Sequence, residues 1–126
     1  MSLLQRYVMP LVILMLFATP ILADEIPQGV SVVTAPELRK MLAEKKVLVV
    51  NALSRIEYRV QHIPGSINIP VDELQSSSDM PADKLQPIAF YCNGVACPYS
   101  RRACQIAVRL GYKHVYWFKG GILEWR

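Results

Sequence analysis

The chain has 126 residues, which suffices for one domain with a hydrophobic core and is too short for two ordinary domains. Its formal net charge of +4 comes from bases scattered along the chain, without the dense basic stripe and interleaved aromatic residues of a nucleic-acid site. A nucleic-acid partner is therefore not expected. The three cysteines are too few to hold the fold together by disulfides.

Residues 1–23 have the layout of a secretory signal. Arg6 precedes an apolar run over residues 8–17 that carries no charge, and Ala23 stands directly before the acidic Asp24. A basic start, an apolar middle and a small residue before the cleavage site are typical of export signals. We expect cleavage after Ala23 and export, to the periplasm if the source is a bacterium.

The alternative for this segment is a membrane anchor through residues 8–22. Pro10 and Pro20 interrupt the stretch, and its length falls short of the roughly 20 apolar residues that a membrane-spanning helix needs. Contact with a membrane is therefore expected only if the segment remains uncleaved.

Residues 24–29 are predicted to be a linker that leads into one α/β domain over residues 30–126. Strands alternate with helical segments there, which indicates a mainly parallel sheet flanked by helices. The predicted strands are residues 30–33, 47–50, 66–69, 88–91 and 115–118. The predicted helical segments are residues 34–46, 56–60, 71–74 and 100–110, and a last segment covers residues 122–125.

Local signals mark several of these boundaries. Thr34 and Glu37 have the spacing of a capping box, and Pro36 suits the first turn of the helix that they would begin. Gly111 is expected to end the helix of residues 100–110. His62-Ile63-Pro64-Gly65 predicts a turn.

Cys92 is the leading candidate for chemistry. It follows the apolar strand of residues 88–91 and precedes a helix that begins at Pro98 or Ser100. At such a turn, loop amides and the helix N-terminus can face one point, which favours an anion and lowers the pKa of a thiol. We therefore interpret Cys92 as a nucleophile with a lowered pKa.

Two predicted loops are expected to meet at Cys92. Ligands of parallel sheets bind beyond the carboxyl ends of the strands, and both Asn51 and Cys92 stand at such ends. Residues 51–56 and 92–99 are thus predicted to form two walls of one crevice. Tyr91 and Trp117 are interpreted as core or crevice-lining aromatics.

The other cysteines have different predicted roles. Cys97 is either a disulfide partner or resolving thiol for Cys92, or a loop cysteine with a structural role. Cys104 shares a helix with small apolar residues and is expected in the core. One disulfide and one free thiol is the simplest arrangement for three cysteines. No metal site and no cofactor are predicted, because neither histidine has a second histidine nearby.

Residues 30–126 resemble the rhodanese domain through several motifs in the family's order and spacing. The matching motifs are residues 47–51, 57–58, 62–70, 91–92, 111–116 and 119–125. The resemblance implies a five-stranded parallel sheet flanked by helices, with Cys92 in the place of the sulfur-carrying cysteine. Members of that family take sulfane sulfur from a donor such as thiosulfate, hold it as a persulfide and pass it to a thiol or to cyanide.

A persulfide anion needs stabilisation, which inward-pointing loop amides at a helix N-terminus supply. Gly94 suits a loop that approaches sulfur closely or takes a positive φ. Arg101 and Arg102 are either solvated or steer an anionic donor. The residues predicted to stabilise the anion are Asn93, Gly94, Val95, Ala96, Tyr99 and Ser100.

The sequence also departs from the family pattern. Asn51 and Leu53 stand where an aspartate and an arginine are usual, and Ser100 follows Cys92 by eight positions, two more than usual, without a loop arginine. A phosphatase of the same fold would need that arginine. Three hypotheses remain: a sulfurtransferase with a small sulfur donor and a thiol acceptor, a redox module of Cys92 and Cys97, and a silent binding domain. The oligomeric state is not predicted.

Overall fold

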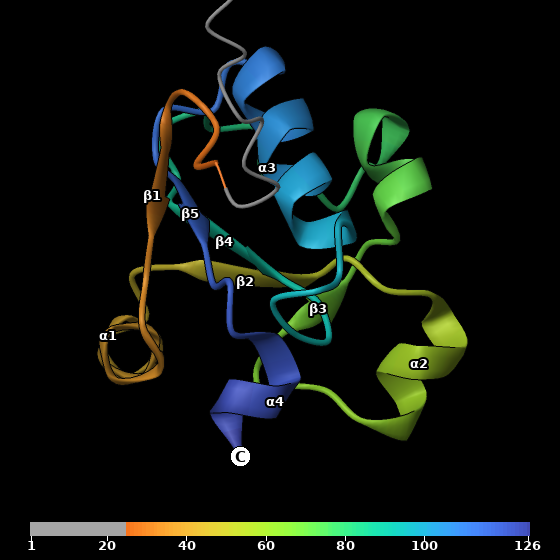
Figure 1. Ribbon diagram of the computed structural model, residues 1–126. Coiled ribbons are helices and arrows are strands. Elements are labelled where there is room, and N and C mark those ends of the chain that lie inside the picture. The colour runs from red at the N-terminus through yellow and green to blue at the C-terminus, as the bar shows by residue number, and fades with distance from the viewer. Residues whose placement is uncertain (1–24) are drawn as a thin grey trace, which may run out of the picture.

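The computed structural model describes residues 25–126, and the predicted signal or anchor lies outside them. Five parallel strands form one sheet in the order β1-β5-β4-β2-β3 (Figure 1). The strands are β1 Val30–Val32, β2 Leu48–Asn51, β3 Ile67–Asn68, β4 Ile88–Tyr91 and β5 Val115–Trp117. The prediction of a five-stranded parallel sheet is confirmed.

In the described residues, four helical segments connect the strands and a fifth follows β5. They are α1 Ala35–Ala43, α2 Arg55–Val60, a 3₁₀ helix η1 Val71–Ser76, α3 Tyr99–Arg109 and α4 Gly121–Trp125. Because α3 begins at Tyr99, Ser100 lies in its first turn. The last segment, whose type the sequence left open, is a short helix. No helix in residues 25–126 is both long and apolar enough to cross a membrane.

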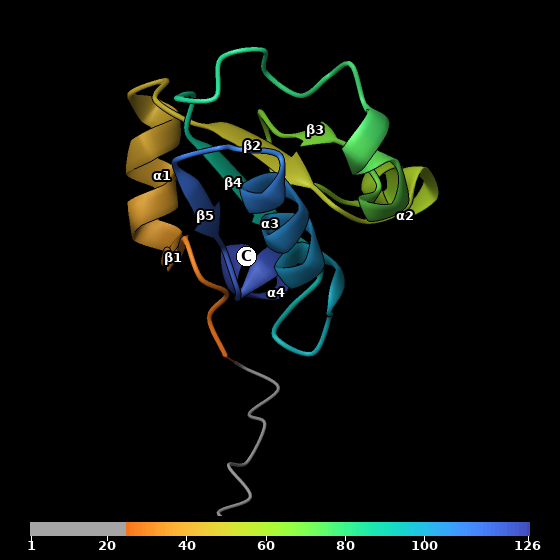
Figure 2. The ribbon, with the colours of Figure 1, turned by 90° about the horizontal axis from the view of Figure 1, so that it is seen from above.

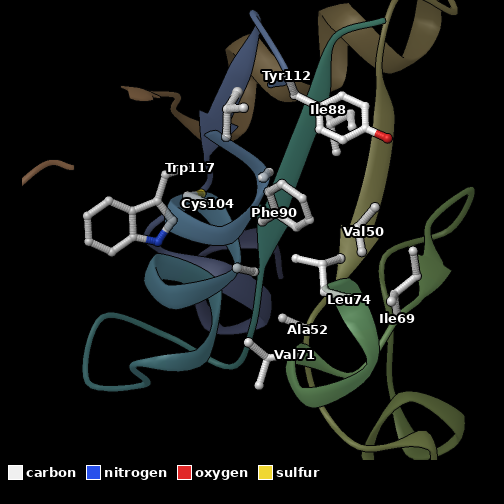
Figure 3. Close-up of a cluster of buried hydrophobic side chains, with 13 residues drawn as sticks. Val50, Ala52, Ile69, Val71, Leu74, Ile88, Phe90, Cys104, Tyr112 and Trp117 are labelled. Atoms are coloured by element: carbon white, nitrogen blue, oxygen red, sulfur yellow. The ribbon is translucent and has the colours of Figure 1, made fainter. Parts of the chain in front are cut away.

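Helices cover both faces of the sheet, as Figures 1 and 2 show. On one face α3 packs over β4 and β5, with η1 against α3, and Figure 3 shows the buried side chains between these helices and the sheet. On the other face α1 and α4 contribute Leu38 and Ile122 to a second buried cluster, which also contains Cys92. An apolar strand between two such layers explains why β4 is buried along its whole length.

Cys104 belongs to the first of these clusters, so its predicted place in the core is confirmed. Its side chain is fully buried, and its thiol lies 3.6 Å from the carbonyl oxygen of Tyr116. Burial raises the pKa of this thiol well above its ordinary value. Cys104 is therefore an inert apolar residue of the core at neutral pH.

The predicted helix caps are partly confirmed. The Thr34 hydroxyl oxygen accepts from the Glu37 amide at 3.4 Å, but the Glu37 carboxylate accepts from the Thr34 hydroxyl instead of the Thr34 amide. The full reciprocal box occurs instead at α2, between Ser54 and Glu57. Gly111 follows α3 with a φ of +97°, as expected for a glycine that ends a helix.

Tyr91 anchors the end of β4 through a buried hydrogen-bond network. Its hydroxyl accepts from the Ile63 amide at 2.9 Å and lies 2.8 Å from the Ser66 hydroxyl, which itself donates to the Ile63 carbonyl at 2.6 Å. Since the Ser66 hydrogen is used in that way, the Tyr91 hydroxyl donates to Ser66. Burial raises the pKa of Tyr91 and keeps it protonated for this role.

Tyr91→Phe tests this network. The substitution leaves the buried Ile63 amide without its partner, and we expect it to lower the free energy of unfolding by about 1–3 kcal/mol in urea denaturation. Tyr99→Phe is the matched control, because Tyr99 is 44% exposed and its hydroxyl can bond to water. Equal effects of the two substitutions would contradict the role of the network.

Candidate functional site

Cys92 lies directly after β4, beyond the carboxyl end of a central strand, and only 1% of its surface is exposed. The start of α4 covers it. The Cys92 carbonyl accepts from the Ile122 amide at 3.1 Å, and the Asn93 carbonyl accepts from the Leu123 amide at 3.0 Å. These two bonds fix the first residues of the loop against the C-terminal helix and close the site on that side.

The close approach of α4 to this loop depends on Gly121. This residue has a φ of +57°, and a Cβ on it would lie 2.4 Å from the Cys92 carbonyl oxygen. Only glycine satisfies both the left-handed backbone and that contact. Of the two reasons expected for Gly94, a close approach or a positive φ, the structure shows no positive φ. The close neighbour of Gly94 is Leu123, whose Cδ1 would lie 2.9 Å from an added Cβ.

The Cys92 thiol has two polar neighbours. Its Sγ lies 3.2 Å from the Ser100 hydroxyl oxygen and 3.5 Å from the Cys97 carbonyl oxygen. The Ser100 oxygen also accepts from the Trp117 indole N–H at 2.9 Å. Because Trp117 fills one acceptor position of Ser100, the serine hydroxyl can turn its own hydrogen toward the sulfur when the sulfur is anionic.

The pKa of Cys92 is raised to about 11, so the predicted lowering of that pKa is wrong for this structure. Burial is the main cause, and the adjacent Cys97 thiol adds to it, whereas the hydroxyl and amide of Ser100 act in the opposite direction. Two further loop positions offer the sulfur no donor. The Cys97 amide donates to the Gly94 carbonyl at 3.0 Å, and Pro98 has no N–H. At neutral pH Cys92 is therefore a protonated thiol.

A cavity of about 500 Å³ lies beside the loop. Cys97 lines it and Cys92 does not, so the partly exposed Cys97 is the thiol that a molecule in this cavity would meet. Arg101 and Arg102 give the cavity its positive charge. The other lining residues are Val95, Ala96, Pro98, Tyr99, Gln105 and Trp117.

Both arginines have partners that hold them near the cavity. The Nε of Arg101 donates to the Glu25 carbonyl at 2.9 Å, and the Nη1 of Arg102 lies 3.9 Å from the Asp72 carboxylate. The contact of Arg101 involves Nε, so the two terminal nitrogens of its guanidinium remain as donors for an anion. Anion steering by these residues stays a prediction.

The two loops that were expected to form one crevice do meet. A hollow of about 260 Å³ is lined by Leu53 and Ile56 from one loop and by Asn93 from the other, with Ile122 of α4 beside them. Cys92 is buried and lines neither this hollow nor the cavity at Cys97. In this closed arrangement, the loop of residues 92–99 covers the candidate nucleophile.

Asn51 and Leu53 form an uncharged wall beside this loop. The Asn51 side chain is buried, and its Oδ1 accepts from the Leu53 amide at 2.9 Å. The Asn68 side-chain amide donates to the carbonyls of Leu53 at 2.9 Å and Asn51 at 3.1 Å. Amide hydrogen bonds therefore fix the backbone here without an ion pair.

Of the residues predicted to stabilise a sulfur anion, the structure brings Ser100 to the Cys92 sulfur. Val95, Ala96 and Tyr99 face the cavity at Cys97, and the Asn93 carbonyl contacts α4. Any contribution of these four residues to a bound sulfur stays a prediction. All three cysteines are free thiols in this structure. A disulfide between Cys92 and Cys97 therefore stays a prediction. No cluster of metal-ligating side chains occurs within residues 25–126.

The geometry agrees with a family match. The family model described as "Rhodanese-like domain" matches residues 34–126. The chain belongs to the rhodanese-like domain family. The match runs from the start of α1 to the end of α4 and includes β2 to β5 and the Cys92 loop, whereas β1 precedes it.

Named relatives differ in how much of them the chain covers. It is 31% identical over 110 residues to a human thiosulfate:glutathione sulfurtransferase, covering 77% of this chain and 94% of that protein. It is 33% identical over 105 residues to an HTH-type transcriptional regulator of Mycobacterium tuberculosis, covering 82% of this chain. The chain spans 45% of that regulator, so the domain also occurs within longer proteins.

Solved structures show the same fold. A human single-domain sulfurtransferase matches with a TM-score of 0.68 and 30% identity, over 75% of this chain and 93% of that one. A protein of Bacillus halodurans matches with a TM-score of 0.69 and 26% identity, over 76% of this chain and 71% of that one. The family match and the human sulfurtransferases support sulfurtransferase activity in general terms.

Gly121→Ala tests the contact between α4 and the Cys92 loop. We expect a loss of stability above the roughly 1–2 kcal/mol that a left-handed alanine costs, because the added Cβ also displaces the Cys92 carbonyl. Gly111→Ala is the matched control, since it has a positive φ but open space around its Cβ. Urea denaturation measures both variants, and an equal loss in the two would refute the contact.

Ser100→Ala tests the hydroxyl that lies 3.2 Å from the Cys92 sulfur. Without the hydroxyl, the pKa of Cys92 rises further, and the rate of its alkylation at about pH 9 falls by about tenfold. Site-resolved mass spectrometry follows Cys92 and, as the internal control, Cys97. Loosening of the fold would speed alkylation, so a fall in the rate cannot come from a loosened fold. An unchanged or faster rate would contradict the assignment.

Proposed function

We propose that this protein is a sulfurtransferase in which Cys92 carries sulfane sulfur as a persulfide. The observation that carries the proposal is the place of Cys92, after a central strand and against the first turn of α3, with the Ser100 hydroxyl 3.2 Å from its sulfur. The domain family and the human sulfurtransferase that matches over nearly its whole length support this reading.

The reaction has two displacements. The Cys92 thiolate attacks the outer sulfur of thiosulfate, the new S–S bond forms, and sulfite leaves with the electron pair of the broken S–S bond. A thiolate acceptor then attacks the outer sulfur of the persulfide and takes it, and Cys92 leaves as a thiolate. No net electron transfer to an outside oxidant or reductant is needed.

The electrostatics of the site bear on the first displacement. The nucleophile is the thiolate, and a pKa of about 11 leaves about one thiol in 10⁴ ionised at neutral pH. The Ser100 hydroxyl and amide favour that minor form. Because Cys92 is buried, the loop of residues 92–99 has to move for a donor to reach the sulfur.

The donor is proposed to be a small anion such as thiosulfate, guided by Arg101 and Arg102 at the edge of the loop. The acceptor is proposed to be a thiol, as in the name of the human relative. We also propose that the protein acts after export, on the basis of the sequence of residues 1–23.

Loading with thiosulfate tests the proposal directly. After incubation, intact-mass measurement under non-reducing conditions should show a chain heavier by one sulfur atom, or sulfide should have been released from the chain. In both cases sulfite should be released in a stoichiometric amount. Cys92→Ser should show neither sulfur addition nor sulfite release, because the attacking thiolate is gone.

Cys104→Ala is the matched control, since that cysteine is equally buried but belongs to the core, and it should react as the wild type does. The sulfurtransferase function would be refuted if the wild type reacts neither with thiosulfate nor with a low-molecular-weight persulfide as a second donor. Equal reaction in Cys92→Ser would refute the choice of Cys92.

A further inference from the structure

Cys97 and Cys92 lie together inside one short loop. The Cys92 sulfur is 3.5 Å from the Cys97 carbonyl oxygen, and the Cys97 thiol is close enough to help raise the pKa of Cys92. The turn closed by the Cys97 amide and the Gly94 carbonyl at 3.0 Å brings the second cysteine back toward the first. Cys97 is thus the neighbouring nucleophile for any sulfur carried on Cys92.

The two thiols face different surroundings. Cys92 is 1% exposed, whereas Cys97 is partly exposed and lines the cavity of about 500 Å³ together with Arg101 and Arg102. Of the two thiols, Cys97 is therefore the one that water and dissolved molecules reach. A solvated thiol beside a buried sulfur carrier has the arrangement of a resolving cysteine.

We propose that Cys97 is the first acceptor of the Cys92 persulfide, and that it resolves the persulfide to a Cys92–Cys97 disulfide with release of hydrosulfide. This inference rests on the proposed function, because it needs sulfur on Cys92. It makes the protein a reducer of sulfane sulfur: the sulfur atom leaves as sulfide, and the two cysteines of the loop supply the electrons.

The resolving step is a thiol–disulfide exchange within the loop. The Cys97 thiolate attacks the inner sulfur of the persulfide, which is the Cys92 Sγ, and the Sγ–Sγ bond forms. The bond between the inner and outer sulfur breaks. The outer sulfur takes the proton that the Cys97 thiol gave up and leaves with the electron pair as hydrosulfide. The sulfane sulfur is reduced by two electrons, and the two cysteine sulfurs are oxidised to the disulfide.

The choice of the inner sulfur follows from the leaving groups. Attack on the outer sulfur would expel the Cys92 thiolate, whose conjugate acid is weak in its buried position. Attack on the inner sulfur expels hydrosulfide, the anion of a stronger acid, and the better leaving group departs faster. Burial of Cys92 thus favours the disulfide over transfer of the persulfide to Cys97.

Turnover requires an outside dithiol as reductant. One of its thiolates attacks the sulfur of Cys97, which lines the cavity, and the other completes the exchange, so that both cysteines return as thiols and the dithiol becomes a disulfide. The positive charge of Arg101 and Arg102 at this cavity favours a reductant with negative charge near its thiols.

The experiment is a single turnover with one donor. Wild type, Cys97→Ser and the control Cys104→Ala are mixed with excess thiosulfate without reductant, and sulfite, sulfide, intact mass and disulfides are measured. We expect wild type and Cys104→Ala to release one sulfide per chain and end two hydrogens lighter, with a mapped Cys92–Cys97 disulfide. Cys97→Ser should release sulfite, gain one sulfur atom, keep it and release no sulfide.

The outcomes separate this inference from the proposed function. Sulfite release with a persulfide equally lasting in wild type and Cys97→Ser would overturn the role of Cys97 and leave the sulfurtransferase intact. Absence of sulfite from every variant, together with no reaction of the wild type with a low-molecular-weight persulfide, would refute the sulfurtransferase function and the inference with it.

Oxidation by diamide gives a second measurement that needs no sulfur donor. It should form the Cys92–Cys97 disulfide in the folded wild type, and dithiothreitol should reverse it. If both thiols stay free under diamide while the protein remains folded, the two sulfurs do not reach each other and the inference fails.

Discussion

The hydrogen bond from the Ile122 amide to the Cys92 carbonyl is the contact on which the site depends. It joins the last helix to the end of a central strand, and Gly121 permits the approach because a side chain there would overlap the Cys92 carbonyl oxygen. The same contact closes the apolar layer over β4 and leaves the Cys92 thiol out of water. The position of the nucleophile and its raised pKa therefore have one structural cause.

Cys92 is buried and few hydrogen-bond donors surround its sulfur, so the thiol is favoured over the thiolate. A sulfur anion at the end of a strand is stabilised when several amides converge on it, but here the favourable groups are the hydroxyl and amide of Ser100. Trp117 orients that hydroxyl from the neighbouring strand. The Cys97 carbonyl lies 3.5 Å from the sulfur and favours a protonated thiol. The closed loop protects a resting thiol.

The loop of residues 92–99 also holds a second thiol. Cys97 reaches both the Cys92 thiol and the cavity beside Arg101 and Arg102. In the proposed mechanism, the buried Cys92 holds sulfur away from water and the partly exposed Cys97 meets dissolved thiols. The third cysteine, Cys104, is separated from this chemistry by its place in the core.

Most of the fold followed from local patterns in the sequence. The apolar runs that became β2 and β4 and the glycine after α3 are signals that depend on neighbouring residues alone, and the strand–loop–helix order placed Cys92 correctly. The sign of its pKa shift did not follow, because desolvation depends on α4, a segment about 30 residues away.

Two other residues of the site could not be predicted from the sequence, for the same reason. Gly121 and Trp117 reach the site through packing between distant elements, which no local pattern states. The Gly120-Gly121 pair after β5 was the available signal, but a pair of glycines does not show what it contacts.

The pH dependence of sulfur loading onto Cys92 tests the central claim most directly, namely that a buried, protonated Cys92 is the sulfur carrier. The measurement is the initial rate of sulfite release from thiosulfate in Cys97→Ser, where resolution cannot occur. A thiol of high pKa predicts a rate that rises by about tenfold for each pH unit from about pH 7 toward pH 9. A rate that is already level at neutral pH would show a low-pKa thiolate and contradict this account of the site.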